Sequence, residues 1–188
     1  MEEYTYEIKI PRERVAVLIG KKGEIKREVE QATKTNIDVD STEGDVLIRG
    51  KDSIGMLSAK DVVMAIGRGF NPEIALLLLK QDYCFELISI ADYAGKSRNS
   101  MERLKGRIIG SEGKSRRTIE TLTETNLSVY GKTVGIIGEI ANVDCARKAI
   151  EKLLEGSQHA GVYKWLEKKR KDLKMSGFAG KGMKQPEE

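Results

Sequence analysis

The sequence predicts an α+β fold built from two similar domains, and three observations support it. Residues 14–40 and 104–130 match when they are shifted by 90 positions, and the match pairs Gly20-x-x-Gly23 with Gly110-x-x-Gly113. In each copy this Gly-x-x-Gly stretch separates a short apolar helical pattern from a charged amphipathic one. Each copy then continues into alternating apolar and polar residues, which is typical of strands buried on one side. A repeat of this length indicates two copies of one structural unit.

The first copy is expected to have the order β-α-α-β-β-α and to occupy residues 1–69. Its opening strand alternates over residues 4–10 and stops at Pro11. The elements that follow are helices at 12–19 and 24–34, strands at 36–40 and 45–49, and a helix at 52–67. An interdomain helix is expected at 70–82, because Asn71-Pro72 offers a capping side chain and a first-turn proline. Its apolar run is expected to be buried between the domains.

The second copy repeats this order within residues 83–157. Its expected elements are a strand at 83–91, helices at 101–109 and 114–124, strands near 126–130 and 133–137, and a helix at 142–155. About ten extra residues, Asp92 to Met101, separate its first strand from its first helix. A basic helix is expected at 158–175, and the glycine-containing residues 176–188 are expected to be disordered.

Positive charge is concentrated in certain segments rather than spread over the whole chain. Charged residues make up 33% of the sequence, yet the formal net charge is only +4. Residues 96–117 carry eight lysines and arginines against two glutamates. The two cysteines, Cys84 and Cys145, are too few for a disulfide framework or a metal cluster. No stretch is apolar enough for a signal peptide or a membrane span, so we expect a cytoplasmic protein without membrane contact.

The Gly-x-x-Gly stretch has the chemistry of a phosphate-binding turn. Glycines lack a Cβ atom, so a sugar–phosphate backbone is able to come close to the main chain. The N–H groups at the start of the following helix, together with its dipole, favour an anion at that position. Because the stretch occurs twice in the same setting, the sequence predicts nucleic-acid binding.

The setting of this stretch resembles that of the K-homology (KH) domain. An aliphatic pair precedes each glycine loop, and helix, strand and strand follow it. The resemblance implies two tandem eukaryotic-type (type I) KH domains, in which the loop clamps about four nucleotides of a single strand. Aromatic residues are only 5% of the chain, which disfavours recognition by base-stacking platforms.

Longer stretches narrow this resemblance. The segments GRGFNPEIALLLL, DYAGKSRNSMERLKGRIIG and NLSVYGKTVGIIG are similar to the archaeal tandem KH-domain ribosome-assembly family. This family includes the dimethylase-interacting factor, also called the partner of Nob. The similarity covers nearly the whole chain up to about residue 167. It implies binding to single-stranded RNA at the 3′ end of small-subunit (16S) rRNA, as a ribosome biogenesis factor. It also implies two protein partners, the alpha subunit of translation initiation factor two and the Nob endonuclease.

The candidate site residues surround the two glycine loops. The predicted RNA-binding residues in the second domain are Gly106, Arg107, Ile108, Gly110, Ser111, Glu112, Gly113, Lys114, Arg116 and Arg117. A second candidate site, for RNA or for a protein, comprises Gly20, Lys21, Lys22, Gly23 and Lys26. Gly106 is expected to let a base approach its helix. Of two neighbouring isoleucines, Ile108 is assigned to the RNA groove and Ile109 to the core.

The positive charges give opposing indications of which domain binds RNA. Lys21-Lys22 within the first loop favours the first domain, whereas the wider basic segment around the second loop and the family resemblance favour the second. We assign RNA to the second domain and a protein partner to the first. Glu112 is the one acid in either loop, and it is expected to point to solvent while backbone N–H groups hold the phosphate.

The sequence predicts no enzyme, no catalytic residue, no metal and no cofactor. The single histidine, His159, has no patterned nucleophile near it, and no metal-ligand spacing or nucleotide-binding loop is present. The alternative to an RNA-binding protein is an adaptor that links a translation initiation or maturation factor to the small subunit, with little RNA binding of its own.

Overall fold

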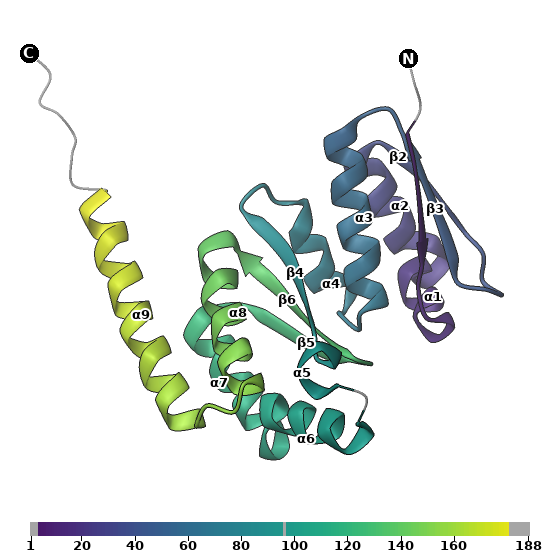
Figure 1. The fold of residues 1–188 in the computed structure, drawn as a ribbon. Coiled ribbons are helices and arrows are strands. Elements are labelled where there is room, and N and C mark those ends of the chain that lie inside the picture. Colours follow the sequence, from purple (N-terminus) through teal and green to yellow (C-terminus); the bar gives the residue numbers. More distant parts are fainter. Residues whose placement is uncertain (1–3, 96, 181–188) are drawn as a thin grey trace, which may run out of the picture. The chain divides into compact units, whose positions relative to one another are not determined.

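The computed structural model describes residues 4–95 and 97–180, with side chains described up to residue 172. In its first half, the order β-α-α-β-β-α predicted from the repeat is confirmed (Figure 1). The elements are β1 (Tyr4–Lys9), α1 (Arg12–Ile19), the 3-10 turn η1 (Lys21–Gly23), α2 (Glu24–Thr33), β2 (Thr35–Val39), β3 (Asp45–Gly50) and α3 (Ser53–Gly67). Asp52 caps α3, since its carboxylate accepts a hydrogen bond from the N–H of Gly55 at 2.8 Å.

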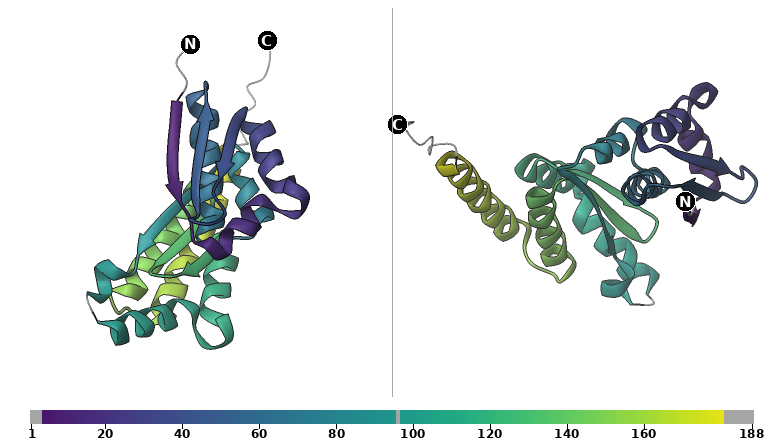
Figure 2. Two further views of the ribbon diagram at one scale, coloured as in Figure 1. Left: turned by 90° about the vertical axis from the view of Figure 1, so that its right-hand side faces the viewer. Right: turned by 90° about the horizontal axis from the view of Figure 1, so that it is seen from above.

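The first sheet is antiparallel with the strand order β1-β3-β2. Tyr4 pairs with Gly50 and Lys9 with Asp45, and on the other side Thr35 pairs with Gly50. Strand alternation puts Ile37, Val46 and Ile48 into the core. Leu18 and Val29 of the first two helices are completely buried in the same cluster, as are Met56 and Ile66 of α3. Figure 2 shows this domain from two further sides.

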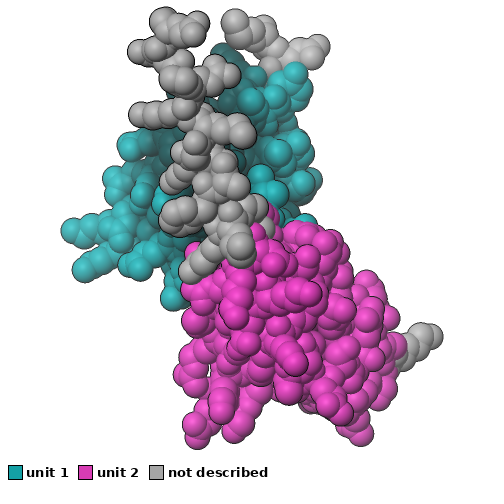
Figure 3. Space-filling model, turned by 90° about the vertical axis from the view of Figure 1, so that its left-hand side faces the viewer, with its two compact units in different colours: residues 1–89, 126–140 teal, residues 90–125, 141–188 magenta. Residues whose placement is uncertain are grey.

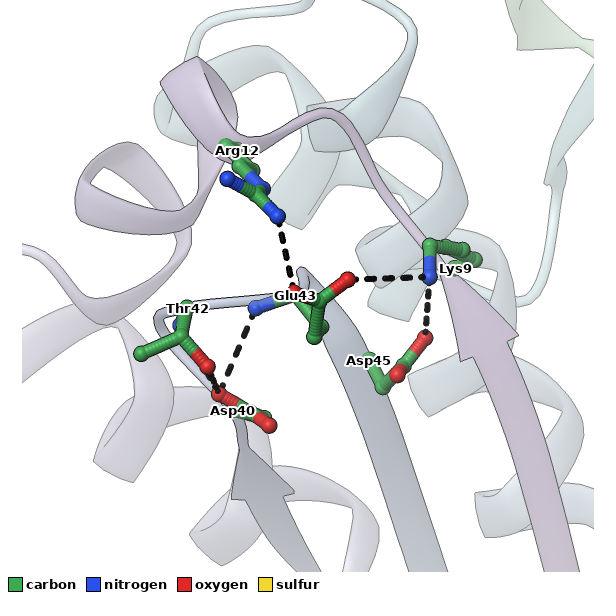
Figure 4. A network of polar contacts seen from close by, with 6 residues as sticks. All are labelled: Lys9, Arg12, Asp40, Thr42, Glu43 and Asp45. Carbon is green, nitrogen blue, oxygen red and sulfur yellow. Dashed lines mark hydrogen bonds and ion pairs between the residues drawn. The ribbon is translucent and has the colours of Figure 1, made fainter.

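A polar network fixes the turn between β2 and β3 (Figure 4). The carboxylate of Asp40 accepts hydrogen bonds from the N–H of Thr42 at 2.8 Å and from its hydroxyl at 2.6 Å, and these bonds hold the pKa of Asp40 below its usual range. Glu43 at the tip pairs with Arg12 at 2.8 Å and with Lys9 at 3.9 Å. The turn is therefore tied to the end of β1 and the start of α1.

The second half repeats the same order after a short connection. That connection is α4 (Pro72–Ala75) and the 3-10 turn η2 (Leu76–Leu79), a tighter path than the predicted continuous helix. The elements that follow are β4 (Tyr83–Ser89), α5 (Ala91–Ala94), α6 (Arg98–Ile109), the 3-10 turn η3 (Ser111–Gly113), α7 (Lys114–Thr123), β5 (Asn126–Tyr130), β6 (Thr133–Glu139) and α8 (Ile140–Leu154). The second sheet is antiparallel with the order β4-β6-β5. Tyr83 pairs with Glu139 and Asn126 with Ile137.

Two segments differ from the sequence-based expectation. The extra residues of the second copy form helix α5 and the first turn of α6, which begins at Arg98 because Ser97 caps it. The last helix, α9 (His159–Gly180), continues past residue 175, where we expected disorder to begin. A single glycine within a helix costs only about 1 kcal/mol, so Gly177 does not stop it. The rest of the predicted disordered tail, residues 181–188, lies outside the described residues.

The chain divides into two compact units that do not coincide with the two repeats (Figure 3). One unit joins residues up to 89 with residues 126–140, and the other joins residues 90–125 with those from 141 on. The first unit thus contains the whole first domain and the strands of the second. Ile137 and Phe85 belong to the hydrophobic cluster of the first domain, and the ring of Phe85 meets that of Phe70 edge-to-face at 6.2 Å.

Polar contacts hold the second sheet to the first domain within this unit. The hydroxyl of Ser128 donates to the carbonyl oxygen of Arg68 at 2.8 Å. The hydroxyl of Tyr130 donates to the carboxylate of Glu13, which lowers the pKa of Glu13 and raises the pKa of Tyr130. Removing residues 83–140 would consequently expose part of the first domain's core.

Candidate nucleic-acid interface

The two Gly-x-x-Gly loops have the same backbone. Gly20 and Gly110 both have φ +73°, with ψ at 178° and 173°. The third residue of each loop, Lys22 or Glu112, lies in the left-handed region with φ +52°. Each loop ends at a left-handed glycine from which α2 or α7 starts. The repeat in the sequence therefore produces one backbone geometry with different side chains on it.

The two glycines of each loop are needed for different reasons. A Cβ atom on Gly110 would lie 2.7 Å from the backbone nitrogen of Ser115, and one on Gly20 would lie 2.5 Å from Cγ1 of Ile25. The first glycine thus lets the loop fold onto its own helix. A Cβ atom on Gly23 or Gly113 would meet nothing within 4 Å. The second glycine is therefore open to the outside, where a phosphate is able to approach the main chain.

An arginine one turn into each following helix holds its loop. Nη2 of Arg117 donates to the carbonyl oxygen of Glu112 at 2.7 Å. Nη2 of Arg27, at the matching position, donates to the carbonyl oxygen of Lys22 at 2.8 Å. Both guanidinium groups are exposed and lie beside the open glycine. The 90-residue shift aligns Arg27 with Arg117, a predicted site residue, so Arg27 becomes a further candidate at the first loop although the sequence analysis did not name it.

The structure reverses the assignment of the two isoleucines before the second loop. Ile108 is completely buried, whereas Ile109 is partly exposed. Ile108 therefore belongs to the core, and Ile109 is the residue available to a groove. The reason is helical phase: Met101, Leu104 and Ile108 follow the i, i+3, i+7 spacing of one buried stripe. In the first domain Leu18 and Ile19 divide in the same way.

Gly106 lies on the exposed side of α6, one turn before the loop. A Cβ atom there would meet nothing within 4 Å, so the packing of the described residues gives no reason for a glycine. A glycine in a helix costs about 1 kcal/mol relative to alanine. Ala16 occupies the matching position of the first domain. At this position the exposed face of α6 therefore carries no side chain, whereas that of α1 carries a methyl group.

Arg107, a predicted RNA-binding residue, has its side chain engaged within the protein. Its Nε donates to the carbonyl oxygen of Leu153 at 2.9 Å and its Nη2 to that of Ser157 at 2.5 Å. These carbonyls lie at and just after the end of α8, where a cation satisfies groups that the helix leaves unpaired. Nε2 of His159 lies 2.8 Å from the carbonyl oxygen of Arg107 itself. Arg107 and the single histidine therefore join α6 to the α8–α9 connection.

The remaining predicted cations differ in how they are held. Lys114 is exposed at the first position of α7. Arg116 pairs with Glu120 at 3.6 Å, and Lys26 pairs with Glu30 at 3.7 Å at the matching position. In the loops themselves, Lys21 and Lys22 of the first domain and Ser111 and Glu112 of the second are all exposed. Every one of these side chains reaches solvent beside a glycine that is open to a ligand.

Other kinds of site are not evident in the part of the chain that the structure describes. There, no group of three or more histidine, cysteine or acidic side chains is placed to hold a metal ion. Within the same residues, no helix has the length and apolar character that crossing a membrane requires.

Comparison with known proteins identifies both halves of the chain. A KH-domain model matches residues 5–65. A model for the second KH domain of PNO1, a eukaryotic type KH-domain (KH-domain type I), matches residues 84–171. A KH domain-containing protein of Methanocaldococcus jannaschii is 51% identical over 175 residues, which cover 91% of this chain and 76% of that protein. RNA-binding protein PNO1 of Oryzias latipes is 32% identical over 114 residues, and the match spans about half of that relative, 47%.

Two solved structures share both sequence and fold with this chain. The crystal structure of Dim2p from Pyrococcus horikoshii is 44% identical with a TM-score of 0.80, covering 88% of this chain and 99% of that one. The complex of a/eIF2alpha, aDim2p and rRNA from the same organism matches at 44% identity with a TM-score of 0.83, over 90% of this chain and 96% of that chain. The two glycine loops, the β-α-α-β-β-α order in both halves and these matches agree, and the chain belongs to the archaeal tandem KH-domain family of PNO1 and Dim2.

Proposed function

We propose that the protein is a ribosome biogenesis factor that binds single-stranded RNA, without enzymatic activity. Its ligand is the 3′ end of small-subunit (16S) rRNA, and the loop Gly110-Ser111-Glu112-Gly113 is its main RNA site. One observation carries the proposal: a left-handed glycine, open to solvent, starts α7 and is flanked by exposed basic side chains. Such a loop takes splayed nucleotides and excludes a matched A-form duplex. PNO1 of Chaetomium thermophilum, which is 33% identical over 107 residues, is named as a pre-rRNA-processing protein. That name supports a role in the same process.

The second domain is favoured over the first by the face that precedes its loop. Gly106 leaves α6 bare where Ala16 stands in the first domain, and a base needs such space to lie against the helix. Ile109 supplies an adjacent partly exposed aliphatic side chain. Lys114 and Arg117 stand at the other side of the open glycine, within the first turn of α7. Base, groove and phosphate contacts would thus all lie along α6, η3 and α7.

The first domain is proposed to dock a protein, with the alpha subunit of translation initiation factor two as the candidate. The complex of a/eIF2alpha with aDim2p and rRNA supports such a partner, because the related protein forms one complex with a/eIF2alpha and rRNA. The exposed residues Lys21 and Lys22 would suit an acidic surface on the partner. An adaptor role is therefore compatible with RNA binding rather than an alternative to it.

A loop exchange in the full chain tests which domain holds RNA. Ser111→Lys with Glu112→Lys adds three positive charge units to the second loop, and Lys21→Ser with Lys22→Glu removes three from the first. The fourfold variant keeps the composition and net charge of the chain, so only the position of the charge changes. Full-length protein is used because Phe85 and Ile137 complete the core of the first domain.

Affinity for a fluorescent single-stranded RNA with the 16S 3′-end sequence is then measured by anisotropy. If the second loop holds RNA, the exchanged variant binds more tightly, by about five-fold or more for a charge gained within about 4 Å of a phosphate. Weaker binding by the exchanged variant would assign RNA to the first loop. Equal affinity for the single strand and a matched hairpin stem, in either protein, would contradict KH-type recognition.

A further inference from the structure

Helices α7 and α9 enclose a groove that begins at the second glycine loop. Val162 and Leu166 of α9 are almost completely buried, which fixes this helix beside its neighbours in the second unit. An ion pair of 3.3 Å between Arg170 and Glu124 holds α9 to the end of α7. Between the two helices lies a hollow of about 350 Å³ lined by Lys114, Arg117, Thr118, Thr121, Leu122 and Glu167.

A second hollow continues the first along α9. It has a volume of about 470 Å³ and is lined by Leu122, Glu167, Arg170 and Lys171. Because Leu122 and Glu167 line both hollows, the two adjoin and form one groove. Eight residues separate Lys114 from Leu122, which corresponds to about 12 Å along a helix. The groove therefore extends well beyond the reach of the loop itself.

The lining of this groove is basic and otherwise polar or short. Lys114, Arg117, Arg170 and Lys171 contribute four positive charges, against one negative charge from Glu167 within the lining and one from Glu124 paired with Arg170. The hydroxyls of Thr118 and Thr121 and the side chain of Leu122 make up the rest. A positive groove without aromatic side chains suits a sugar–phosphate backbone rather than stacked bases.

We propose that the groove between α7 and α9 is a second contact surface for the RNA backbone, continuous with the loop at residues 110–113. This inference rests on the proposed function, and it extends the RNA site beyond the nucleotides that the loop clamps. Lys114 and Arg117 belong to both surfaces, since they start α7 and also line the first hollow. A strand leaving the loop would thus meet Arg170 and Lys171 next. In this proposal helix α9 is part of the RNA site.

Two lysines of α9 provide a matched pair for the test. Lys171 lines the groove. Lys169 instead lies near Cys145 of α8, where its positive charge partly offsets the rise that burial causes in the pKa of that thiol. The two are exposed, and two helical steps place them about 160° apart around the axis. Lys171→Glu and Lys169→Glu change the net charge equally. Each is measured by anisotropy against single strands of about four and about twelve nucleotides, since the loop alone holds about four.

The proposal expects Lys171→Glu to weaken binding of the longer RNA by about ten-fold relative to Lys169→Glu, with both variants alike on the short RNA. The slope of log K against log salt for the longer RNA should also become shallower by about 0.7 for each phosphate that Lys171→Glu no longer neutralises. Equal effects of the two variants on the longer RNA would overturn the proposal that the groove contacts RNA. So would an equal weakening on both RNAs by Lys171→Glu, because that residue would then act at the loop. Melting temperatures and the milder pair Lys171→Gln and Lys169→Gln separate a folding defect from a specific weakening of RNA binding.

The loop is tested separately in the same titrations. Failure of the wild-type protein to bind the short RNA, or a short-RNA affinity that the loop exchange leaves unchanged, would count against the proposed function. Neither result depends on residues of α9.

Discussion

Replacing Ser111 and Glu112 by aspartate should remove most RNA binding and leave the fold intact. Both residues are exposed, and both glycines of the loop are kept. Glu112 already occupies a left-handed conformation with φ +52°, which aspartate tolerates at least as well as glutamate. Stability should therefore change by only a few tenths of a kcal/mol. Since Glu112 is already an acid, the double variant adds one negative charge, at position 111, and shortens the other.

The size of the binding loss follows from where that charge lies. Two like charges 4 Å apart repel by about 1 kcal/mol in bulk water and by about 4 kcal/mol at the effective dielectric of a protein surface. These values correspond to losses of about five-fold and about a thousand-fold in affinity. The paired control is Ser111→Asn with Glu112→Asn, which has the same shape without the charges. Anisotropy titration with single-stranded RNA and a thermal melt are run on both variants. An aspartate variant that melts normally and binds as tightly as the asparagine variant would remove this loop from the RNA site.

Three further predictions concern stability. Gly110→Ala should destabilise the fold more than Gly113→Ala. At Gly113 an alanine would adopt the left-handed conformation, which costs about 1–2 kcal/mol. At Gly110 the backbone, with φ +73° and ψ 173°, lies in a region that is essentially open to glycine alone, and a Cβ atom there would also meet Ser115 at 2.7 Å. Chemical denaturation gives the two free energies, and equal values would be inconsistent with the packing of Gly110. Arg107→Ala should cost about 1–3 kcal/mol, because the carbonyls of Leu153 and Ser157 lose a charged donor; a stable variant with weakened RNA affinity would instead return Arg107 to the RNA site. Burial raises the pKa of Asp61, so its charged form disfavours the fold. Asp61→Asn should therefore stabilise at pH 7, and the gain should vanish as the pH falls below about 4, where aspartate is protonated in both states; urea midpoints at the two pH values check the sign.

Local sequence patterns predicted the fold because the 90-residue repeat carries its own turn chemistry. Glycines at 20, 23, 110 and 113 fix both loops, and alternation fixes the strands on either side of each turn. The burial of Ile108 follows from a pattern within the sequence, since Leu104 four residues earlier sets the buried phase of α6. The hydrogen bonds of the Arg107 side chain within the protein were not predictable from the sequence. Its partners Leu153 and Ser157 lie 46 and 50 residues away, and only the folded α8 brings their carbonyls to it.

The grouping of the second sheet with the first domain was also beyond sequence patterns. Phe85 sits in an alternating strand, and that pattern predicts a core residue of its own domain. In the structure its ring meets Phe70, and Gly135 leaves the space that Phe70 fills, since a Cβ atom there would lie 2.6 Å from that ring. Gly135 lies 65 positions after Phe70, so the periodic pattern within either copy gives no indication of this contact. The repeat thus predicts each domain but not how the strands of one complete the core of the other.

The division of function proposed for the two domains rests on positions at which the two copies differ, on a backbone that is the same. The shared frame extends past the loops: the hydroxyls of Thr33 and Thr35 lie 2.8 Å apart, and so do those of Thr123 and Thr125. On this frame Lys22 and Glu112 adopt the same φ with opposite charge, so the charge is not what shapes the loop. The flanking glycines and the arginine at position 27 or 117 shape it instead. A loop whose form does not depend on its two central residues leaves them free to select a ligand, and in this chain one copy presents two lysines and the other a serine and an acid.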